Sequence, residues 1–322
     1  MRVTVLDPQS GTVPVLAAAT PWQTVLDAYS DAALDSASTR RAYRKACTDA
    51  LTACDVTTLA ELRGAQLAAW RAAVVADTAH SPATKAQAVT ALRPFLTWAR
   101  TMGAHSLSGD VLTAALRVPR ATVLRPYTVL TEAEIAALIG AASTPRDTAL
   151  LAVLLGGGLR VAEVVGLDCS DVIDVEGGAA LHVRQGKGRK DRVVPILPST
   201  AAAIRRSLAA TGRALGDPGP LFLAHDRAAG ARGDQATRLS ARSVGRLVTT
   251  LTARAGIDAR RVSPHSLRHS YAVRALRAGA NVAAVSKLLG HANVATTSRY
   301  LDHLAIAELR AAVPELPGLS AA

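Results

Sequence analysis

Aromatic side chains are scarce in this chain, making up 3% of its 322 residues, whereas hydrophobic residues together make up 49%. Ala, Leu and Val must therefore fill the interior, which favours helices that pack closely through small faces. Cysteine is also rare: Cys47, Cys54 and Cys169 form no Cys-x-x-Cys pair and lie among apolar neighbours. This pattern argues against a disulfide framework or a zinc site and predicts reduced thiols in the core.

Long hydrophobic runs are missing as well. The longest, Ala149 to Leu155, is far shorter than the roughly 20 apolar residues needed to cross a bilayer. The first seven residues break their apolar stretch with a charge at Asp7 and lack the layout of a signal peptide. We therefore expect no membrane partner and a cytoplasmic location.

Positive charge is abundant. The chain has 37 Lys and Arg against 25 Asp and Glu, a formal net charge of +12, and both halves share the excess. A basic surface over both halves suits a protein that grips a polyanion such as DNA from two sides. The alternative is an arginine bias of the host genome with no functional meaning.

The length fits two domains. We expect a loose lead-in over 1–20, a helical domain over 21–117 and an extended linker over 118–127, where two prolines and three basic residues show no periodicity. The second domain is predicted over 128–322. Four helices are expected between residue 21 and about residue 103.

The second domain is predicted to be helical with a small sheet. Thr131 to Glu134 reads as a capping box that opens a helix. An apolar helix over 147–165 is interrupted by three glycines, and the only clear β region covers 179–184 and 192–197. Helices return after Ser199. The predicted fold class is mainly α with a small β-sheet (α+β).

The first candidate catalytic residue along the chain is Arg160, which follows the three glycines. Glu163 lies three residues on and can hold the guanidinium, although a purely structural ion pair is the alternative. Lys187 lies in a predicted hairpin loop with Arg189, Lys190 and Arg192. We expect most of this cluster to be a solvated basic turn, but one lysine delivered into a groove can protonate a leaving alkoxide.

The other candidates lie near the C-terminus. His265 and Arg268 share one face of a predicted helix, and His269 is turned about 100° away from Arg268 and is expected to pack or cap. His291 follows a glycine at a predicted helix end, and Tyr300 lies in a polar stretch. Each residue alone has an ordinary structural explanation. Together they can hold a phosphodiester and attack it with a phenol.

In this order and spacing the residues resemble the tyrosine recombinases, also called the phage integrase family, of the simple Xer-like two-domain type. The resemblance spans roughly 128–305, and segment 21–104 is similar to the family's core-binding domain. The matching motifs are Gly158-Leu159-Arg160-Val161-Ala162-Glu163, Gly186-Lys187-Gly188, His265-Ser266-Leu267-Arg268-His269, Leu288-Leu289-Gly290-His291 and Tyr300.

The resemblance implies a mechanism for site-specific DNA recombination. Arg160 and Arg268 would clamp the scissile phosphate and offset charge in the transition state. His265 and His291 would orient the phosphate and assist removal of the tyrosine proton. Lys187 would protonate the departing 5′ oxygen. The Tyr300 hydroxyl would form a 3′-phosphotyrosyl bond, so neither a metal, a nucleotide nor another cofactor is expected.

The implied partner is double-stranded DNA with paired half-sites, bound by a homo-oligomer that grows from dimer to tetramer on the DNA. No small-molecule substrate is expected. The segment 301–313 reads as an apolar-faced helix that would dock into a neighbouring protomer, or alternatively onto its own domain. The candidate DNA contacts are Arg40, Arg41, Arg44, Lys45, Arg189 and Lys190.

Three alternatives stay open. A catalytically silent DNA-binding protein on this fold would not need Tyr300 and Lys187 together, and a type IB topoisomerase would share the tyrosine chemistry but act alone. A metal-dependent nuclease is disfavoured because no carboxylate cluster accompanies the histidines. The sequence does not choose among Xer, integron and transposon recombinases, and it does not reveal the target site.

Overall fold

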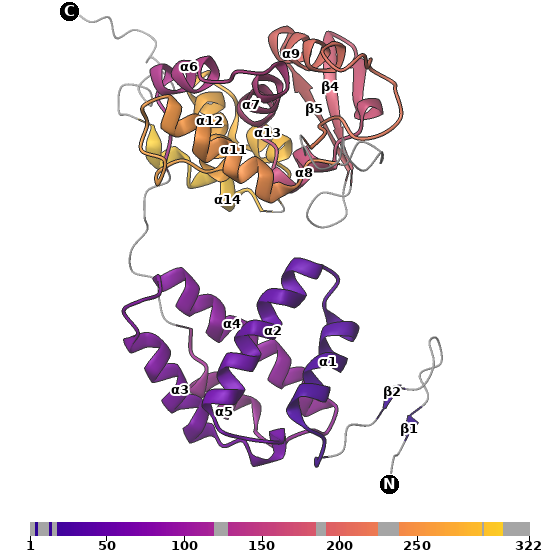
Figure 1. Cartoon of the computed structure of the whole chain (residues 1–322). Helices are drawn as coiled ribbons and strands as arrows, with labels where there is room; N and C mark the ends of the chain where they lie inside the picture. The colour runs from indigo at the N-terminus through magenta and orange to yellow at the C-terminus, as the bar shows by residue number, and fades with distance from the viewer. Residues whose placement is uncertain are drawn as a thin grey trace, which may run out of the picture. The chain divides into compact units, whose positions relative to one another are not determined.

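The computed structural model describes residues 4–5, 13–14, 18–118, 128–184, 191–224, 238–291 and 293–304. The chain divides into two compact units, residues 1–125 and 126–322 (Figure 1). The predicted linker, 118–127, lies outside the described residues except for residue 118. Among the described residues, no helix is long and apolar enough to pass through a membrane.

The first unit is a helical bundle. Four helices lie between residues 21 and 103, as predicted, and a fifth follows. The predicted lead-in contains one short antiparallel strand pair. The elements of the first unit are β1 (Thr4–Val5), β2 (Val13–Pro14), α1 (Trp22–Ala33), α2 (Ala37–Ala53), the 3-10 helix η1 (Leu59–Glu61), α3 (Gly64–Ala76), α4 (Pro82–Thr101) and α5 (Gly109–Ala115).

Helix α4 carries the centre of this core. Leu92, Phe95 and Leu96 are fully buried, and Trp98 is partly buried against the same cluster. The ring of Tyr29 from α1 packs edge-on against Phe95 at 5.4 Å between centroids. Pro94 lies inside α4, yet the helix continues to Thr101.

The described part of the second unit is helical with one three-stranded antiparallel sheet, whose first strand, β3, was not predicted from the sequence. The elements are α6 (Glu132–Gly140), α7 (Pro145–Gly157), α8 (Val161–Gly166), the 3-10 helix η2 (Cys169–Asp171), β3 (Val172–Val175), β4 (Gly178–Val183), β5 (Arg192–Ile196), α9 (Pro198–Ala209), α11 (Ala241–Arg254), α12 (Pro264–Arg277), α13 (Val282–Leu289), α14 (Ala295–Ser298) and the 3-10 helix η3 (Leu301–His303).

Helix α7 is the central helix of this unit. It packs against α9 and β5 on one side and against α12 on the other (Figure 1). Leu150, Leu151 and Leu154 on α7 are fully buried in the main core. The central strand β4 pairs with both β3 and β5, with Leu181 opposite Val172 and Val194. The apolar run that was too short for a membrane span is therefore a core helix.

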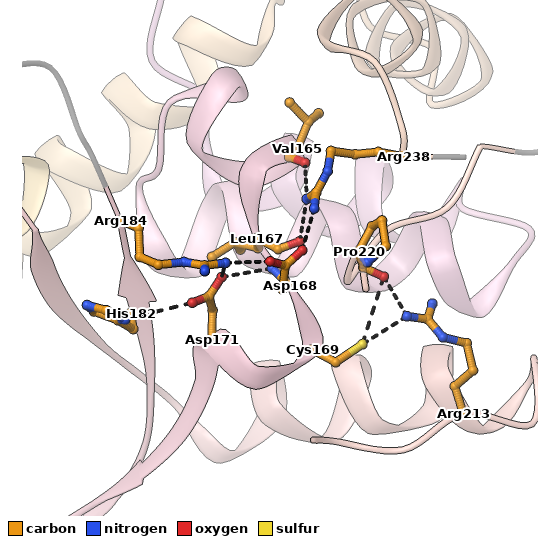
Figure 2. A network of polar contacts seen from close by, with 10 residues as sticks. All are labelled: Val165, Leu167, Asp168, Cys169, Asp171, His182, Arg184, Arg213, Pro220 and Arg238. Atoms are coloured by element: carbon orange, nitrogen blue, oxygen red, sulfur yellow. Dashed lines mark hydrogen bonds and ion pairs between the residues drawn. The ribbon is translucent and has the colours of Figure 1, made fainter. Parts of the chain in front are cut away.

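A polar network holds the C-terminal end of α8 (Figure 2). Nη1 of Arg238 donates to the carbonyl oxygens of Val165 and Leu167, both at 2.9 Å, and Nη2 donates to the carboxylate of Asp168. Arg184 of the sheet region donates to Asp168 at 2.5 Å. Hydrogen bonds from Arg238 and Arg184 hold the pKa of Asp168 below its usual range. The network fixes α8, whose other end carries Arg160.

Candidate active site

Arg160 is placed by the break between α7 and α8. Gly158 ends α7 with φ +61°, a left-handed conformation that glycine adopts readily, and Arg160 is the N-cap of α8. The Glu163 carboxylate accepts the backbone N–H of Arg160 at 2.7 Å and its Nη1–H at 2.8 Å. Glu163 thus holds both the backbone and the side chain of Arg160, as the sequence had suggested for the guanidinium.

Arg268 is the deeply buried arginine of the site, with 1% of its side chain exposed. Its Nη1 donates to the carbonyl of Gly158 at 2.8 Å and its Nη2 to the carbonyl of Leu289 at 2.6 Å. Burial, reinforced by the neighbouring Arg160 cation, lowers the pKa of Arg268 to about 10. The group therefore stays charged at neutral pH.

The two arginines converge on the turn that carries His291. Nη2 of Arg160 donates to the carbonyl of Gly290 at 3.2 Å, directly beside the Leu289 carbonyl that Arg268 binds. Nδ1 of His291 lies 2.7 Å from Oγ1 of Thr297. Burial, together with the nearby guanidiniums, lowers the pKa of His291 to about 4. At neutral pH His291 is a neutral hydrogen-bonding group beside two cations.

Tyr300 is buried beside these groups, with 3% of the residue exposed. Its ring packs in a small apolar cluster between α12 and α13, and it lies 6.4 Å from the His291 ring in a stacked orientation. The Tyr300 hydroxyl lies 2.8 Å from Nδ1 of His269. The polar sequence around Tyr300 had not indicated burial, which follows from the small apolar side chains of α12 and α13.

His265 completes the group on the first turn of α12. Its ring lies 4.2 Å from that of His269, and partial burial together with the Arg268 and Arg160 cations lowers its pKa. The structure therefore brings five of the six predicted catalytic residues into one unit. The sixth, Lys187, lies outside the described residues, as do Arg189 and Lys190.

The predicted DNA contacts of the first unit all lie on α2. Arg40 pairs with Asp31 at 3.4 Å, Lys45 pairs with Asp49 at 2.6 Å, and Arg44 pairs with a further aspartate, Asp27. Arg41 is exposed on the same helix. These carboxylates offset part of the positive charge on α2, and the role of the four basic residues stays a prediction.

Two residues of the site make contacts that were not predicted from the sequence. His269 was expected to pack or cap; it is buried, and its Nδ1 also lies 2.8 Å from the Tyr300 hydroxyl. Arg192 was grouped with a solvated basic turn, but its side chain is 10% exposed and pairs with Glu163. Both contacts join residues about 30 positions apart, which helical periodicity does not reveal. One indication of these roles was present in the sequence: His269 directly follows Arg268, and Arg192 follows the loop that contains Lys187.

The chain is similar to known proteins in sequence. The model of the phage integrase family matches residues 128–305. The tyrosine recombinase XerC of Rhodospirillum centenum is 39% identical over 232 residues, covering 69% of this chain and 62% of that protein. XerC of Corynebacterium glutamicum is 36% identical over 265 residues, covering 80% of this chain and 78% of that protein.

A solved structure shares the fold. The Tn1549 transposon integrase, determined in complex with circular intermediate DNA, superposes with a TM-score of 0.66 at 17% identity, covering 91% of this chain and 98% of that chain. The fold and the site define a protein of the tyrosine recombinase class. The chain belongs to the phage integrase family, which confirms the resemblance and the mainly helical fold class expected from its sequence.

Proposed function

We propose that this protein is a site-specific DNA recombinase that cleaves and rejoins strands through a 3′-phosphotyrosyl intermediate. The observation that carries the proposal is the convergence of Arg160 and Arg268 on adjacent carbonyls of the turn before His291, with Tyr300 packed beside it. Two guanidiniums and a tyrosine in one site match the needs of phosphoryl transfer to a phenol.

In the proposed reaction Arg160 and Arg268 bind the non-bridging oxygens of the scissile phosphate. The Tyr300 oxygen attacks phosphorus as its proton leaves with the help of the neighbouring histidines, and the bond to the 5′ oxygen breaks. Lys187 gives that oxygen its proton. The phosphotyrosyl ester keeps the bond energy, so the reverse attack by a 5′ hydroxyl rejoins DNA without ATP.

The proposed partner is duplex DNA carrying paired half-sites, with the protein assembling from dimer to tetramer on it. The net charge of +12 supports a polyanionic partner. The XerC relatives are named tyrosine recombinases, and the Tn1549 transposon integrase is bound to DNA in its solved structure. The XerC relatives support recombination over the silent DNA-binding protein and the topoisomerase.

A two-site plasmid assay tests the proposal. Two copies of a candidate core site, with inverted half-sites around a short spacer, are placed in direct orientation on one supercoiled plasmid. We expect two smaller circles to form, and only when both copies are present. Relaxation of supercoils on a plasmid with no site would instead favour the topoisomerase. Site-specific binding without strand exchange or nicking would favour the silent protein.

A further inference from the structure

Arg192, the first residue of β5, has its guanidinium occupied within the protein. Nη1 and Nη2 donate to the two carboxylate oxygens of Glu163 at 2.9 and 2.8 Å, a parallel two-bond pairing. Nε donates to the carbonyl of Leu288 at 2.8 Å. The Arg192 and Glu163 side chains are only 10% and 7% exposed. The guanidinium of Arg192 therefore has its partners within the site itself.

Three arginines share the C-terminal end of α13. Arg192 binds the carbonyl of Leu288, Arg268 that of Leu289 and Arg160 that of Gly290. The last carbonyls of a helix lack partners within the helix and carry partial negative charge, so cations stabilise them. Three guanidiniums thus hold three successive carbonyls immediately before His291.

The turn itself is shaped around Arg192. Gly290 ends α13 with φ +65°, and a Cβ added there would lie 3.0 Å from Nη1 of Arg192 and 3.2 Å from its Cδ. A glycine therefore suits this position for its backbone conformation and for the close approach of Arg192. The position of His291, the next residue, depends on this packing.

Among the described residues, Glu163 supplies the one carboxylate that pairs with all three arginines. Its oxygens accept two bonds from Arg160 and two from Arg192, and Nη1 of Arg268 lies 3.8 Å from Oε2. Burial opposes the ionisation of Glu163, but the hydrogen bonds from Arg192 and Arg160 outweigh it and lower its pKa. Without Arg192, the Glu163 carboxylate would pair with Arg160 and Arg268 alone. It would then offset the positive charge of the two groups that are proposed to bind phosphate.

We propose that Arg192 is a positioning residue of the recombinase. It occupies Glu163 and fixes the turn at Leu288 to Gly290, so that Arg160 and Arg268 keep their charge available to the scissile phosphate and His291 faces it. This inference rests on the proposed strand-cleavage function. Arg192 itself contacts no reacting atom in this account.

Four proteins test the role: wild type, Arg192→Met, Glu163→Gln and the double variant. Each is measured for affinity to a core-site duplex and for the single-turnover rate of cleavage of a nicked duplex at saturating protein. We expect Arg192→Met to slow cleavage roughly 10- to 100-fold, which is the loss typical when a residue that orients the ligands of a metal site is replaced. The affinity for DNA should change by less than about threefold. Adding Glu163→Gln should restore part of the rate, because the uncompensated carboxylate is gone.

The double variant also guards against misfolding caused by an unpaired Glu163 carboxylate, since Glu163→Gln removes that charge. A wild-type rate in Arg192→Met would overturn the role, as would a double variant no faster than Arg192→Met. A parallel loss of affinity and rate would make Arg192 a DNA contact.

A second substrate, with sulfur in place of the 5′ bridging oxygen, needs no protonation of its leaving group. If Arg192→Met cleaved this substrate at the full wild-type rate, Arg192 would be the acid that protonates the leaving group instead. Failure of wild type to cleave would reject the proposed function, a different result from any of these.

Discussion

Burial sets the proton chemistry of the histidines around Tyr300. His269 is 5% exposed, and burial, with the neighbouring His265 and Arg268, lowers its pKa to about 3. The pKa of His291 is lowered to about 4 for similar reasons. Both imidazoles are neutral at pH 7 and act as hydrogen-bonding groups. In the proposed mechanism the positive charge at the phosphate therefore comes from arginine and lysine.

These lowered values predict that the folded protein loses stability as the pH falls from about 6.5 towards 4. A histidine in the unfolded chain takes up a proton below about pH 6.5, whereas His269 in the folded protein stays neutral until near its lowered pKa of about 3. Unfolding therefore takes up a proton, which favours the unfolded state in acid. At pH 5 His269 accounts for about 2 kcal/mol of lost stability.

The measurement is the free energy of unfolding in urea at pH 7 and pH 5. The loss between the two should shrink by about 2 kcal/mol in His269→Gln, whose side chain does not titrate. An equal loss in wild type and His269→Gln would show that His269 is protonated in the folded protein.

At the scale of elements, glycines end the helices that bring the arginines together. Gly158 closes α7 and Gly290 closes α13, both in the left-handed conformation. Gly158 also faces the ring of Tyr271, because an added Cβ would lie 2.2 Å from Cδ1 of that ring. The Gly158 carbonyl accepts the Nη1–H of Arg268. Stability and the placement of Arg268 therefore depend on the same residue.

Gly158→Ala is expected to destabilise the protein by about 3 kcal/mol, from about 1–2 kcal/mol for a non-glycine residue in the left-handed region plus overpacking against Tyr271. Gly279→Ala is the matched control, since Gly279 has φ +85° but no atom within 4 Å of an added Cβ. It should show the backbone effect alone. Thermal midpoints report both, and equal shifts would mean that Tyr271 moves aside at no cost.

Local signals in the sequence predicted the elements, whereas the long-range pairings could not be predicted. The glycine run before Arg160 marked the end of α7, and the spacing of His265 and Arg268 placed them on one helix. Strand β3 was missed because its four residues are only half-buried or exposed and show no apolar alternation. The pairing of Arg192 with Glu163 joins two elements 29 residues apart, so no periodic pattern within either element encodes it.

At the scale of the whole molecule, we expect net charge to determine most of the affinity for DNA. Its formal net charge is +12, and no described group of three or more His, Cys, Asp or Glu residues is arranged to hold a metal ion. The phosphate contacts of such a protein release counterions, so the logarithm of the binding constant should fall linearly with the logarithm of the salt concentration. In the proposed mechanism, Arg160, Arg268 and Lys187 supply the positive charge at the scissile phosphate.

Cleavage of a core-site duplex should therefore proceed in excess EDTA and without nucleotide. Arg160 and Arg268 replace the charge that a metal would provide, and the phosphotyrosyl ester replaces the energy of ATP. The assay compares single-turnover rates with EDTA, with magnesium and with magnesium plus ATP, at one ionic strength. Equal rates are expected. A strict requirement for magnesium or ATP is incompatible with the proposed mechanism.

The covalent intermediate tests the central claim most directly. On a nicked suicide duplex, the short strand with the new 5′ hydroxyl diffuses away after attack, so the phosphotyrosine cannot reverse. Wild-type protein should accumulate an SDS-resistant adduct in which the 3′ phosphate is joined to the peptide containing Tyr300. Tyr300→Phe should bind DNA and form none, whereas Tyr271→Phe should still form it. An adduct in Tyr300→Phe, a link mapped to another residue, or no adduct in wild type on a site that it binds would contradict the account.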